Sequence, residues 1–179
     1  MKKLHLGCGD KRLEGYINVD IRKTDATDIV CDVKNLNFEE ESFDLIYNCA
    51  VLEHLMRGEW FNVLKGWSKL LKKGGKIYTS TTDFEAVCKR YEKAKNVEEL
   101  LGFLVGGQKF PYDHHGMVFD FKVLEGAFLK LGFKNIQRFD WRKFDTGLQG
   151  LDDYSQAYLP HMDKENGQLM VLNIVAEKC

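Results

Sequence analysis

Two glycines and several acidic side chains follow short apolar segments in the first third of the chain, and such residues can hold a nucleoside. Leu6-Gly7-Cys8-Gly9 allows a tight turn that brings a ligand close to the main chain. Asp20 ends the next segment, where a carboxylate can accept both hydroxyls of a ribose or cap its own loop. Asp32 can accept an exocyclic amine while the Val33 N–H meets a ring nitrogen, as adenine requires, or can close a turn on its own backbone.

The spacing of these residues argues against a dinucleotide site. Asp20 comes eleven residues after Gly9, whereas a dinucleotide fold places its acid about twenty residues on. Lys11 stands where the third glycine of that motif belongs. The segment Asp10–Tyr16 has room for little more than a turn. We therefore expect no binding of NAD.

A second group of chemically active side chains lies in the glycine-flanked loop Gly106–Gly116. His115 can take up a proton near neutral pH, Asp113 can orient it or act as a second acid, and Tyr112 and Gln108 can contact a substrate. Alternatively, His114-His115 is a loop pair that forms only local hydrogen bonds. We expect no metal site, because there is no His-Glu-x-x-His and adjacent histidines usually diverge.

The elements that position these residues alternate between strands and helices. Helical spacing between Arg57 and Lys73, with Gly74-Gly75 as the stop, predicts one amphipathic helix. Three more helices are predicted: one capped by Thr82 or Asp83 with Val87, Tyr91 and Ala94 inward, one from Asn96 to Gly106, and one from Asp120 to Gly132 with Phe121, Leu124, Phe128 and Leu131 on one stripe. Strands are predicted at Leu4–Leu6, Ile17–Asp20, Ile29–Cys31, Phe43–Tyr47, Ile77–Ser80, Phe133–Phe139 and Gln168–Ala176.

This alternation predicts an α/β fold with right-handed crossovers and a mostly parallel, doubly wound sheet covered on both faces. Ligands of such sheets bind beyond the carboxyl ends of the strands. The candidates for nucleoside binding end or follow predicted strands, so we expect them at that edge, whereas the loop Gly106–Gly116 lies between the predicted helices and the last strands.

Composition restricts the class of protein further. The chain has 179 residues and shows no repeat or linker, so we expect a single domain over residues 1–179. Its formal net charge of −1 gives no reason to expect nucleic acid as a partner, and it has no apolar stretch long enough to span a membrane. The five cysteines are scattered and unpaired in sequence. We therefore expect a cytoplasmic protein with reduced thiols.

The order and spacing of the motifs resemble class I S-adenosylmethionine-dependent methyltransferases, in particular a compact bacterial group associated with polysaccharide synthesis. The resemblance rests on six segments, and it is strong over about the first 90 residues. They are Leu6-Gly7-Cys8-Gly9, Asn18-Val19-Asp20, Leu36-Asn37-Phe38, Ser42-Phe43-Asp44-Leu45-Ile46, Leu52-Glu53-His54 and Lys73-Gly74-Gly75. It implies a Rossmann-like, seven-stranded sheet with an antiparallel last strand and a shortened first crossover. The implied cofactor is S-adenosylmethionine.

The resemblance also implies roles for individual residues. Gly7, Cys8 and Gly9 would line the methionine and ribose portion of the cofactor, Asp20 would hold the ribose, and Asp32 with Val33 would hold the adenine. Asn48 would lie beneath the sulfonium, and Glu53 and His54 near the bound amino acid. His115 matches a recurrent histidine and is the general-base candidate, with Asp113 beside it. His5 replaces an acid common before the glycine turn, which leaves the cofactor's amino group with one fewer acidic partner.

We therefore expect methyl transfer to a small-molecule or sugar-type acceptor. Two alternatives stay open: a catalytically silent protein that binds S-adenosylmethionine or S-adenosylhomocysteine as a sensor or partner subunit, and a nucleotide-dependent oxidoreductase. The stretch Trp141–Gly167, which contains Asp152-Asp153-Tyr154-Ser155, is either a lid over the acceptor site or a homodimer contact.

Overall fold

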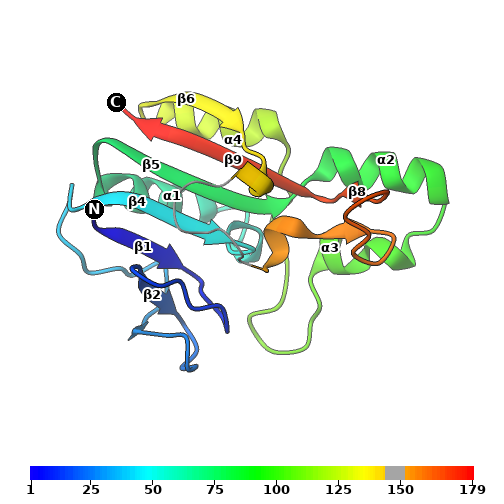
Figure 1. Ribbon diagram of the computed structural model, residues 1–179, viewed down its shortest axis with the longest axis horizontal. Coiled ribbons are helices and arrows are strands. Elements are labelled where there is room, and N and C mark those ends of the chain that lie inside the picture. Colours follow the sequence, from blue (N-terminus) through cyan, green and yellow to red (C-terminus); the bar gives the residue numbers. More distant parts are fainter. Residues whose placement is uncertain (144–151) are drawn as a thin grey trace.

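A seven-stranded sheet in the order β3-β2-β1-β4-β5-β9-β6 forms the centre of the protein (Figure 1). The computed structural model describes residues 1–143 and 152–179. The pairs among β1 to β5 are parallel, whereas β9 is antiparallel to both of its neighbours, β5 and β6. The predicted mostly parallel sheet with an antiparallel last strand is therefore confirmed. Its strands are β1 (Lys3–Leu6), β2 (Ile17–Asp20), β3 (Ile29–Val30), β4 (Phe43–Cys49), β5 (Leu71–Thr82), β6 (Phe133–Arg138) and β9 (Val171–Lys178).

Helices and short turns connect these strands. The α-helices are α1 (Trp60–Leu70), α2 (Phe84–Ala94), α3 (Leu101–Val105) and α4 (Phe121–Lys130). The 3-10 turns are η1 (Leu52–His54), η2 (Glu98–Leu100), η3 (Trp141–Lys143) and η4 (Tyr154–Gln156). A separate two-stranded ribbon pairs β7 (Tyr158–Leu159) with β8 (Gln168–Leu169).

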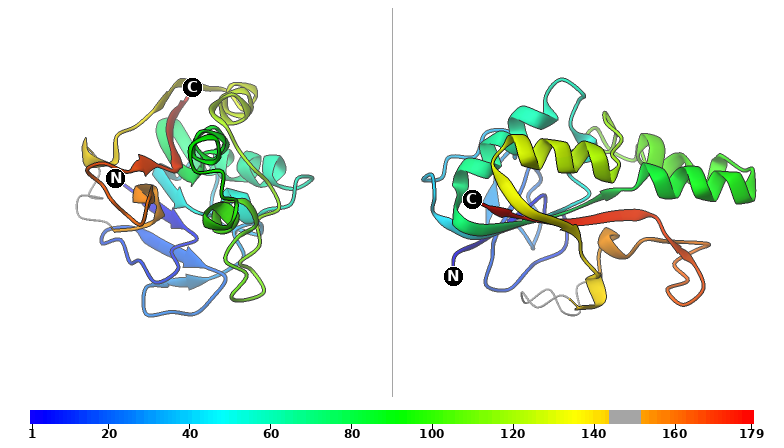
Figure 2. Two further views of the ribbon diagram at one scale, coloured as in Figure 1. Left: turned by 90° about the vertical axis from the view of Figure 1, so that its right-hand side faces the viewer. Right: turned by 90° about the horizontal axis from the view of Figure 1, so that it is seen from above.

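The helices α1 and α4 cover one face of the sheet. Leu64 and Trp67 of α1 and Leu124 and Phe128 of α4 belong to one buried cluster with sheet residues such as Ile46. Seen from above, both helices lie on the same side of the strands (Figure 2). Trp67 is 1% exposed, and truncation of such a side chain to alanine typically costs about 3–5 kcal/mol. This face holds the main core.

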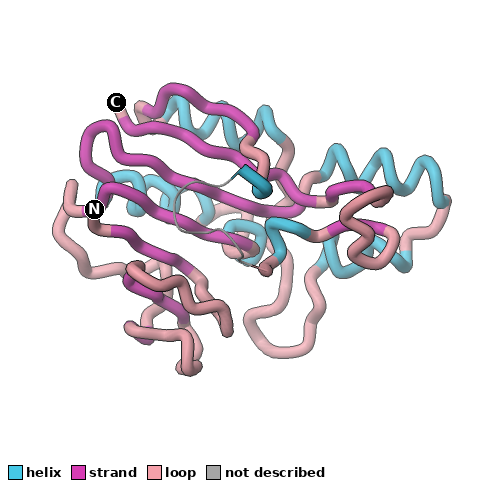
Figure 3. The backbone as a smooth tube through the Cα atoms, in the orientation of Figure 1, coloured by secondary structure: helices cyan, strands magenta, loops and turns pink. Residues whose placement is uncertain are grey.

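The opposite face differs from the prediction, because loops cover it in place of helices. Leu13 and Tyr16 from the first crossover pack there on Leu45, Tyr47 and Cys49 of β4. The connections around β1, β2 and β3 are loops (Figure 3). A crossover as short as the one between β1 and β2 cannot contain a helix and still return to a parallel strand. The predicted shortening of this crossover thus explains why the second layer is thin.

Most predicted helix ends are confirmed by their capping contacts. The Asp83 side chain accepts a hydrogen bond from Glu85 N at the start of α2, and that of Asp120 accepts one from Val123 N at the start of α4. Gly132, with φ +76°, ends the segment after α4. The first predicted helix is shorter than expected, because the chain becomes extended at Leu71, ahead of the two glycines that we expected to stop it.

One predicted helix face is wrong in part. Val87 of α2 is buried as expected, but Tyr91 is 46% exposed. Figure 1 shows the reason: α2 extends beyond the end of the sheet, so its last turns have no layer to pack against. Only its first turns are covered, where Gln168 Nε2 donates to the Ala86 carbonyl at 2.7 Å.

Within residues 1–143 and 152–179, no helix combines the length and the apolar character that crossing a membrane requires.

Candidate active site

The candidate residues meet where the strand order reverses, between β1 and β4. The chain adds β2 and β3 on one side of β1 and then continues with β5 beyond β4. Loops that leave two parallel strands in opposite directions open a crevice at their carboxyl ends. Gly7 follows β1, Asp20 ends β2 and Glu53 follows β4. Each of these residues thus stands at or just beyond the carboxyl end of a strand.

The glycine turn after β1 requires glycine at Gly7. Its φ is +68°, and a Cβ atom there would lie 2.3 Å from Cγ2 of Val51, which is far inside van der Waals contact. Gly9 also has a positive φ, of +54°. The N–H groups of Gly7 and Cys8 both donate to the Val19 carbonyl, at 2.8 and 3.0 Å. The turn is therefore fixed to β2, with main chain in place of side chains at the ligand-facing edge.

Asp20 binds the loops on both sides of it. Its Oδ2 accepts a hydrogen bond from Gly9 N at 2.7 Å and its Oδ1 accepts one from Arg22 N at 2.8 Å. The loop-capping role is thus present. Arg22 Nε also donates to Oδ1, at 3.4 Å, whereas Oδ2 keeps a second lone pair that can accept a ribose hydroxyl. The two sequence interpretations of Asp20 are compatible.

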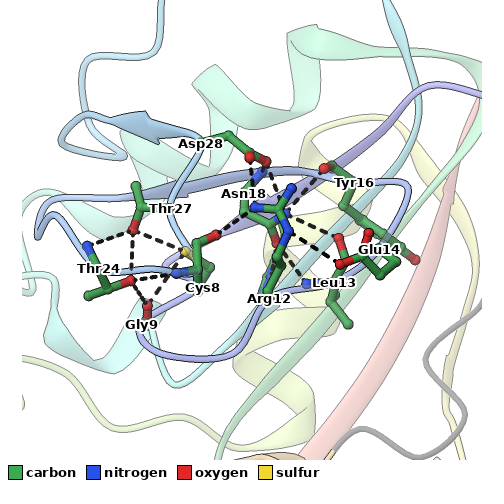
Figure 4. Close-up of polar contacts among 12 residues, drawn as sticks. Cys8, Gly9, Arg12, Leu13, Glu14, Tyr16, Asn18, Thr24, Thr27 and Asp28 are labelled. Carbon is green, nitrogen blue, oxygen red and sulfur yellow. Dashed lines mark hydrogen bonds and ion pairs between the residues drawn. The ribbon is translucent and has the colours of Figure 1, made fainter.

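The first crossover contains no helix and is held together by the buried side-chain amide of Asn18 (Figure 4). Asn18 is fully buried, and its Nδ2 donates to the carbonyls of Leu13 and Tyr16 while its Oδ1 accepts from Leu13 N. Asp28 accepts from Asn18 N at 2.8 Å and from Arg12 at 2.7 Å. The Asn18 N–H, followed by the Arg12 guanidinium, lowers the pKa of Asp28 to about 2. The sequence indicated no role for Asn18, although it begins the segment Asn18-Val19-Asp20.

Asp32 and Val33 follow β3, which is separated from β1 by β2 in the sheet. Asp32 Oδ1 accepts from Lys34 N at 2.9 Å, which is the turn geometry considered as the alternative to adenine binding. The Val33 carbonyl accepts from Trp67 Nε1 at 2.9 Å. This hydrogen bond connects the segment to α1 and so positions it relative to the sheet.

Asn48 does not point to the place expected for it. Its Nδ2 donates to the Tyr78 carbonyl at 3.1 Å and to Thr79 Oγ1 at 3.0 Å, both on β5. The side chain is fully buried inside the sheet. An amide so committed to the neighbouring strand stabilises the pair β4–β5 and is not beneath a ligand at the edge.

Glu53 and His54 form the turn η1 directly after β4. Glu53 is 2% exposed, and its Oε1 accepts from Thr82 N at 3.3 Å. Its carbonyl accepts from the N–H groups of Gly116 and Met117. His54 Nδ1 lies 3.1 Å from the His114 carbonyl. The turn therefore fastens the histidine loop to the carboxyl end of the sheet.

His115 is held in an orientation that suits a base. Its Nδ1 lies 2.9 Å from the Phe103 carbonyl, and its ring meets that of His54 edge to face at 4.8 Å between centroids. Because a carbonyl only accepts, the neutral ring carries its proton on Nδ1 and a lone pair on Nε2. Burial lowers the pKa of His115 from its ordinary value, so the ring is neutral at pH 7.

The role expected of Asp113 as the orienter of His115 is filled by Phe103. Asp113 Oδ2 accepts from Lys109 N at 3.1 Å, and its carbonyl accepts from Gln108 N at 2.9 Å. The aspartate therefore shapes its own loop. Tyr112, expected to contact the acceptor, is 56% exposed.

A contact that the sequence did not indicate joins the two halves of the site. The guanidinium of Arg22 lies 5.0 Å from the ring centroid of Phe110, in the histidine loop. The same guanidinium lies against Gly9, where a Cβ atom would be 3.1 Å from one of its nitrogens. The histidine loop and the glycine turn are thus linked through one side chain.

The donors and acceptors of the site fit an adenosyl amino acid. The glycine turn leaves main chain uncovered, Asp20 Oδ2 retains a lone pair for a ribose hydroxyl, and Oε2 of buried Glu53 has no hydrogen-bond partner among the described residues. In the same part of the chain, no three His, Cys, Asp or Glu side chains converge as metal ligands.

Comparison with known proteins agrees with this geometry. Residues 4–79 match the family model described as a methyltransferase domain, whereas no curated protein matches the chain in sequence. Among solved structures, a SAM-dependent methyltransferase from Thermotoga maritima is 16% identical with a TM-score of 0.61, and covers 99% of this chain and 82% of its own.

A second similar structure contains ligands. It is 1,6-didemethyltoxoflavin-N1-methyltransferase from Burkholderia thailandensis, with bound 1,6-didemethyltoxoflavin and S-adenosylhomocysteine. It is 15% identical with a TM-score of 0.58, and the match covers 98% of this chain and 70% of that one. Identities at this level establish a common fold.

Proposed function

We propose that this chain is a class I S-adenosylmethionine-dependent methyltransferase and that it methylates a small-molecule or sugar-type acceptor. The match of residues 4–79 to a methyltransferase-domain family model and the fold support this. The observation that supports the proposal best is His115, whose Nδ1 proton is held by the Phe103 carbonyl so that Nε2 keeps its lone pair. A group so prepared can accept the proton of a hydroxyl or amine acceptor. The similar Burkholderia structure contains bound 1,6-didemethyltoxoflavin, which supports a small-molecule acceptor.

The chain's residues divide the work between binding and proton transfer. S-adenosylmethionine, when bound, supplies an electrophilic methyl group on its sulfonium. Gly7, Cys8 and Gly9 bind the methionine and ribose portion, Asp20 accepts the ribose hydroxyls, and Asp32 with Val33 holds the adenine. His115 accepts the proton of the acceptor. Glu53 then stabilises the imidazolium, since its charge is the largest influence that raises the pKa of His115.

Calorimetric titration tests the binding half of the proposal. We expect S-adenosylmethionine and S-adenosylhomocysteine to bind the wild type, NAD not to bind, and Asp20→Ala to weaken both adenosyl ligands. Binding of NAD in preference to the adenosyl ligands would favour an oxidoreductase and would refute the proposal.

Turnover of an acceptor panel tests the catalytic half. General bases typically contribute 10²- to 10⁴-fold, so we expect roughly that loss of kcat in His115→Ala. His161→Ala is the matched control, because that histidine is exposed and lies outside the site. Binding of the adenosyl ligands without methylation of any acceptor would favour the silent binding protein, and unchanged kcat in His115→Ala would exclude this base.

A further inference from the structure

A carboxylate from the far end of the chain reaches the central strand β4. Asp153 Oδ2 accepts a hydrogen bond from the hydroxyl of Tyr47 at 2.6 Å, across 106 positions of sequence. Its Oδ1 accepts from Ser155 N at 2.9 Å, at the start of η4. The Ser155 carbonyl in turn accepts from Asn173 Nδ2 on β9 at 2.9 Å. The carboxylate is thus held between β4 and β9.

The strand register gives the level at which this carboxylate lies. His5 of β1 pairs with Tyr47 of β4, and Leu6 pairs with Asn48. Gly7 therefore directly follows Leu6, whose partner Asn48 is the residue after Tyr47. Tyr47 and Cys49 belong to the loop-covered face of the sheet. Burial raises the pKa of the Cys49 thiol most, and the charge of Asp153 raises it further. Asp153 therefore also acts on the last residue of β4.

Asp153 has no cationic partner within residues 1–143 and 152–179. It forms no ion pair there, whereas its neighbour Asp152 pairs with Lys164 at 3.4 Å. The charge of Asp153 also acts on His5, which is 2% exposed. Burial lowers the pKa of His5, so its ring is neutral at pH 7. A partly buried carboxylate in this setting favours a cation that comes from outside the chain.

We propose that Asp153 binds the α-ammonium group of the cofactor's methionine portion, with Tyr47 as its positioning residue. The inference rests on the proposed function. The acid that related sequences carry before the glycine turn is replaced here by His5, and Asp153 brings a carboxylate to the same region from η4. A charge-assisted hydrogen bond between ammonium and carboxylate is among the strong contacts of a binding site.

The test measures binding of two ligands that differ only in the amino group. Calorimetric titrations with S-adenosylhomocysteine and with its desamino analogue, which has hydrogen in place of the ammonium, are made on the wild type and on Asp153→Asn. We expect the wild type to prefer S-adenosylhomocysteine by roughly 10- to 100-fold, as for hydrogen bonds to charged groups. Asp153→Asn should abolish this preference and bind the desamino analogue like the wild type.

Three further variants separate this role from a structural one. Asp152→Asn, next in the chain and exposed, should keep the full preference, and Tyr47→Phe should reduce it without changing the affinity of the desamino analogue. Asp20→Ala should weaken both ligands equally, because both contain the ribose. If Asp153→Asn fails to fold, Tyr47→Phe decides the question.

The proposal is overturned if the wild type binds both ligands equally, or if Asp153→Asn weakens them by the same factor or leaves the preference intact. These results leave the proposed function standing. Failure of the wild type to bind S-adenosylhomocysteine at all would refute the proposed function itself, and the role of Asp153 with it.

Discussion

The ring of His115 is hydrogen-bonded to the carbonyl of Phe103, with 2.9 Å between Nδ1 and O. Phe103 belongs to α3, so this short helix decides which ring nitrogen carries the proton. The nitrogen left with the lone pair is the one that can act as a base. The chemistry assigned to the histidine loop thus depends on a main-chain atom twelve residues upstream.

We predict that His115 titrates below its ordinary pKa of 6.5, because burial disfavours the imidazolium. The base form therefore persists as the pH falls through 6.5, and the rate of methyl transfer should decline only at lower pH. Proton NMR of the histidine rings measures the midpoint, with the signal assigned by its absence in His115→Asn. A midpoint at or above 6.5 would contradict the prediction.

Removal of the Glu53 charge should lower the pKa of His115 further. Glu53 is the largest influence that raises this pKa, and Asp113 is the smallest. In the same NMR titration, we expect Glu53→Gln to move the midpoint downward and Asp113→Asn to move it less. If the His115 midpoint moved as much or more in Asp113→Asn, the orienting role would belong to Asp113 and not to Phe103.

Gly7→Ala should destabilise the protein and impair binding of the adenosyl ligands. The left-handed conformation costs a residue with Cβ about 1–2 kcal/mol, and the contact with Val51 adds to this. Gly66→Ala is the matched control, since Gly66 lies in α1 with open space around it, and alanine there should stabilise by about 0.8–1.0 kcal/mol. Urea unfolding gives both values, and equal effects of the two substitutions would contradict the argument.

Loss of the Arg22–Phe110 contact should loosen the histidine loop. A cation–π contact at an exposed site contributes about 0.5–1 kcal/mol, which corresponds to a roughly two- to fivefold change in local opening. We expect Phe110→Ala to speed amide exchange in residues 106–116 by that factor. Tyr112→Ala, in the same loop, serves as the control because the side chain is 56% exposed. Similar rates of amide exchange in both variants would show that the Arg22–Phe110 contact does not hold the loop.

The sequence by itself determined the features that depend on local patterns. The alternation of apolar segments predicted the seven strands, the family resemblance implied that the last one is antiparallel, and Gly7, Asp20 and His115 were found from motifs. A positive φ or a carboxylate at a strand end is a property of a few adjacent residues, so spacing is sufficient to detect it. The short first crossover was predicted as well, from the distance between Gly9 and Asp20.

The tertiary structure decided which distant groups meet. The bond between Tyr47 and Asp153 joins positions 106 residues apart, and Phe103 replaces Asp113 beside His115. The amide of Asn48 turned into the sheet because β5 offers it two acceptors there. Such contacts are fixed by how strands and loops pack in space. Sequence separation carries no information about that packing, whereas strand register and burial determine it directly.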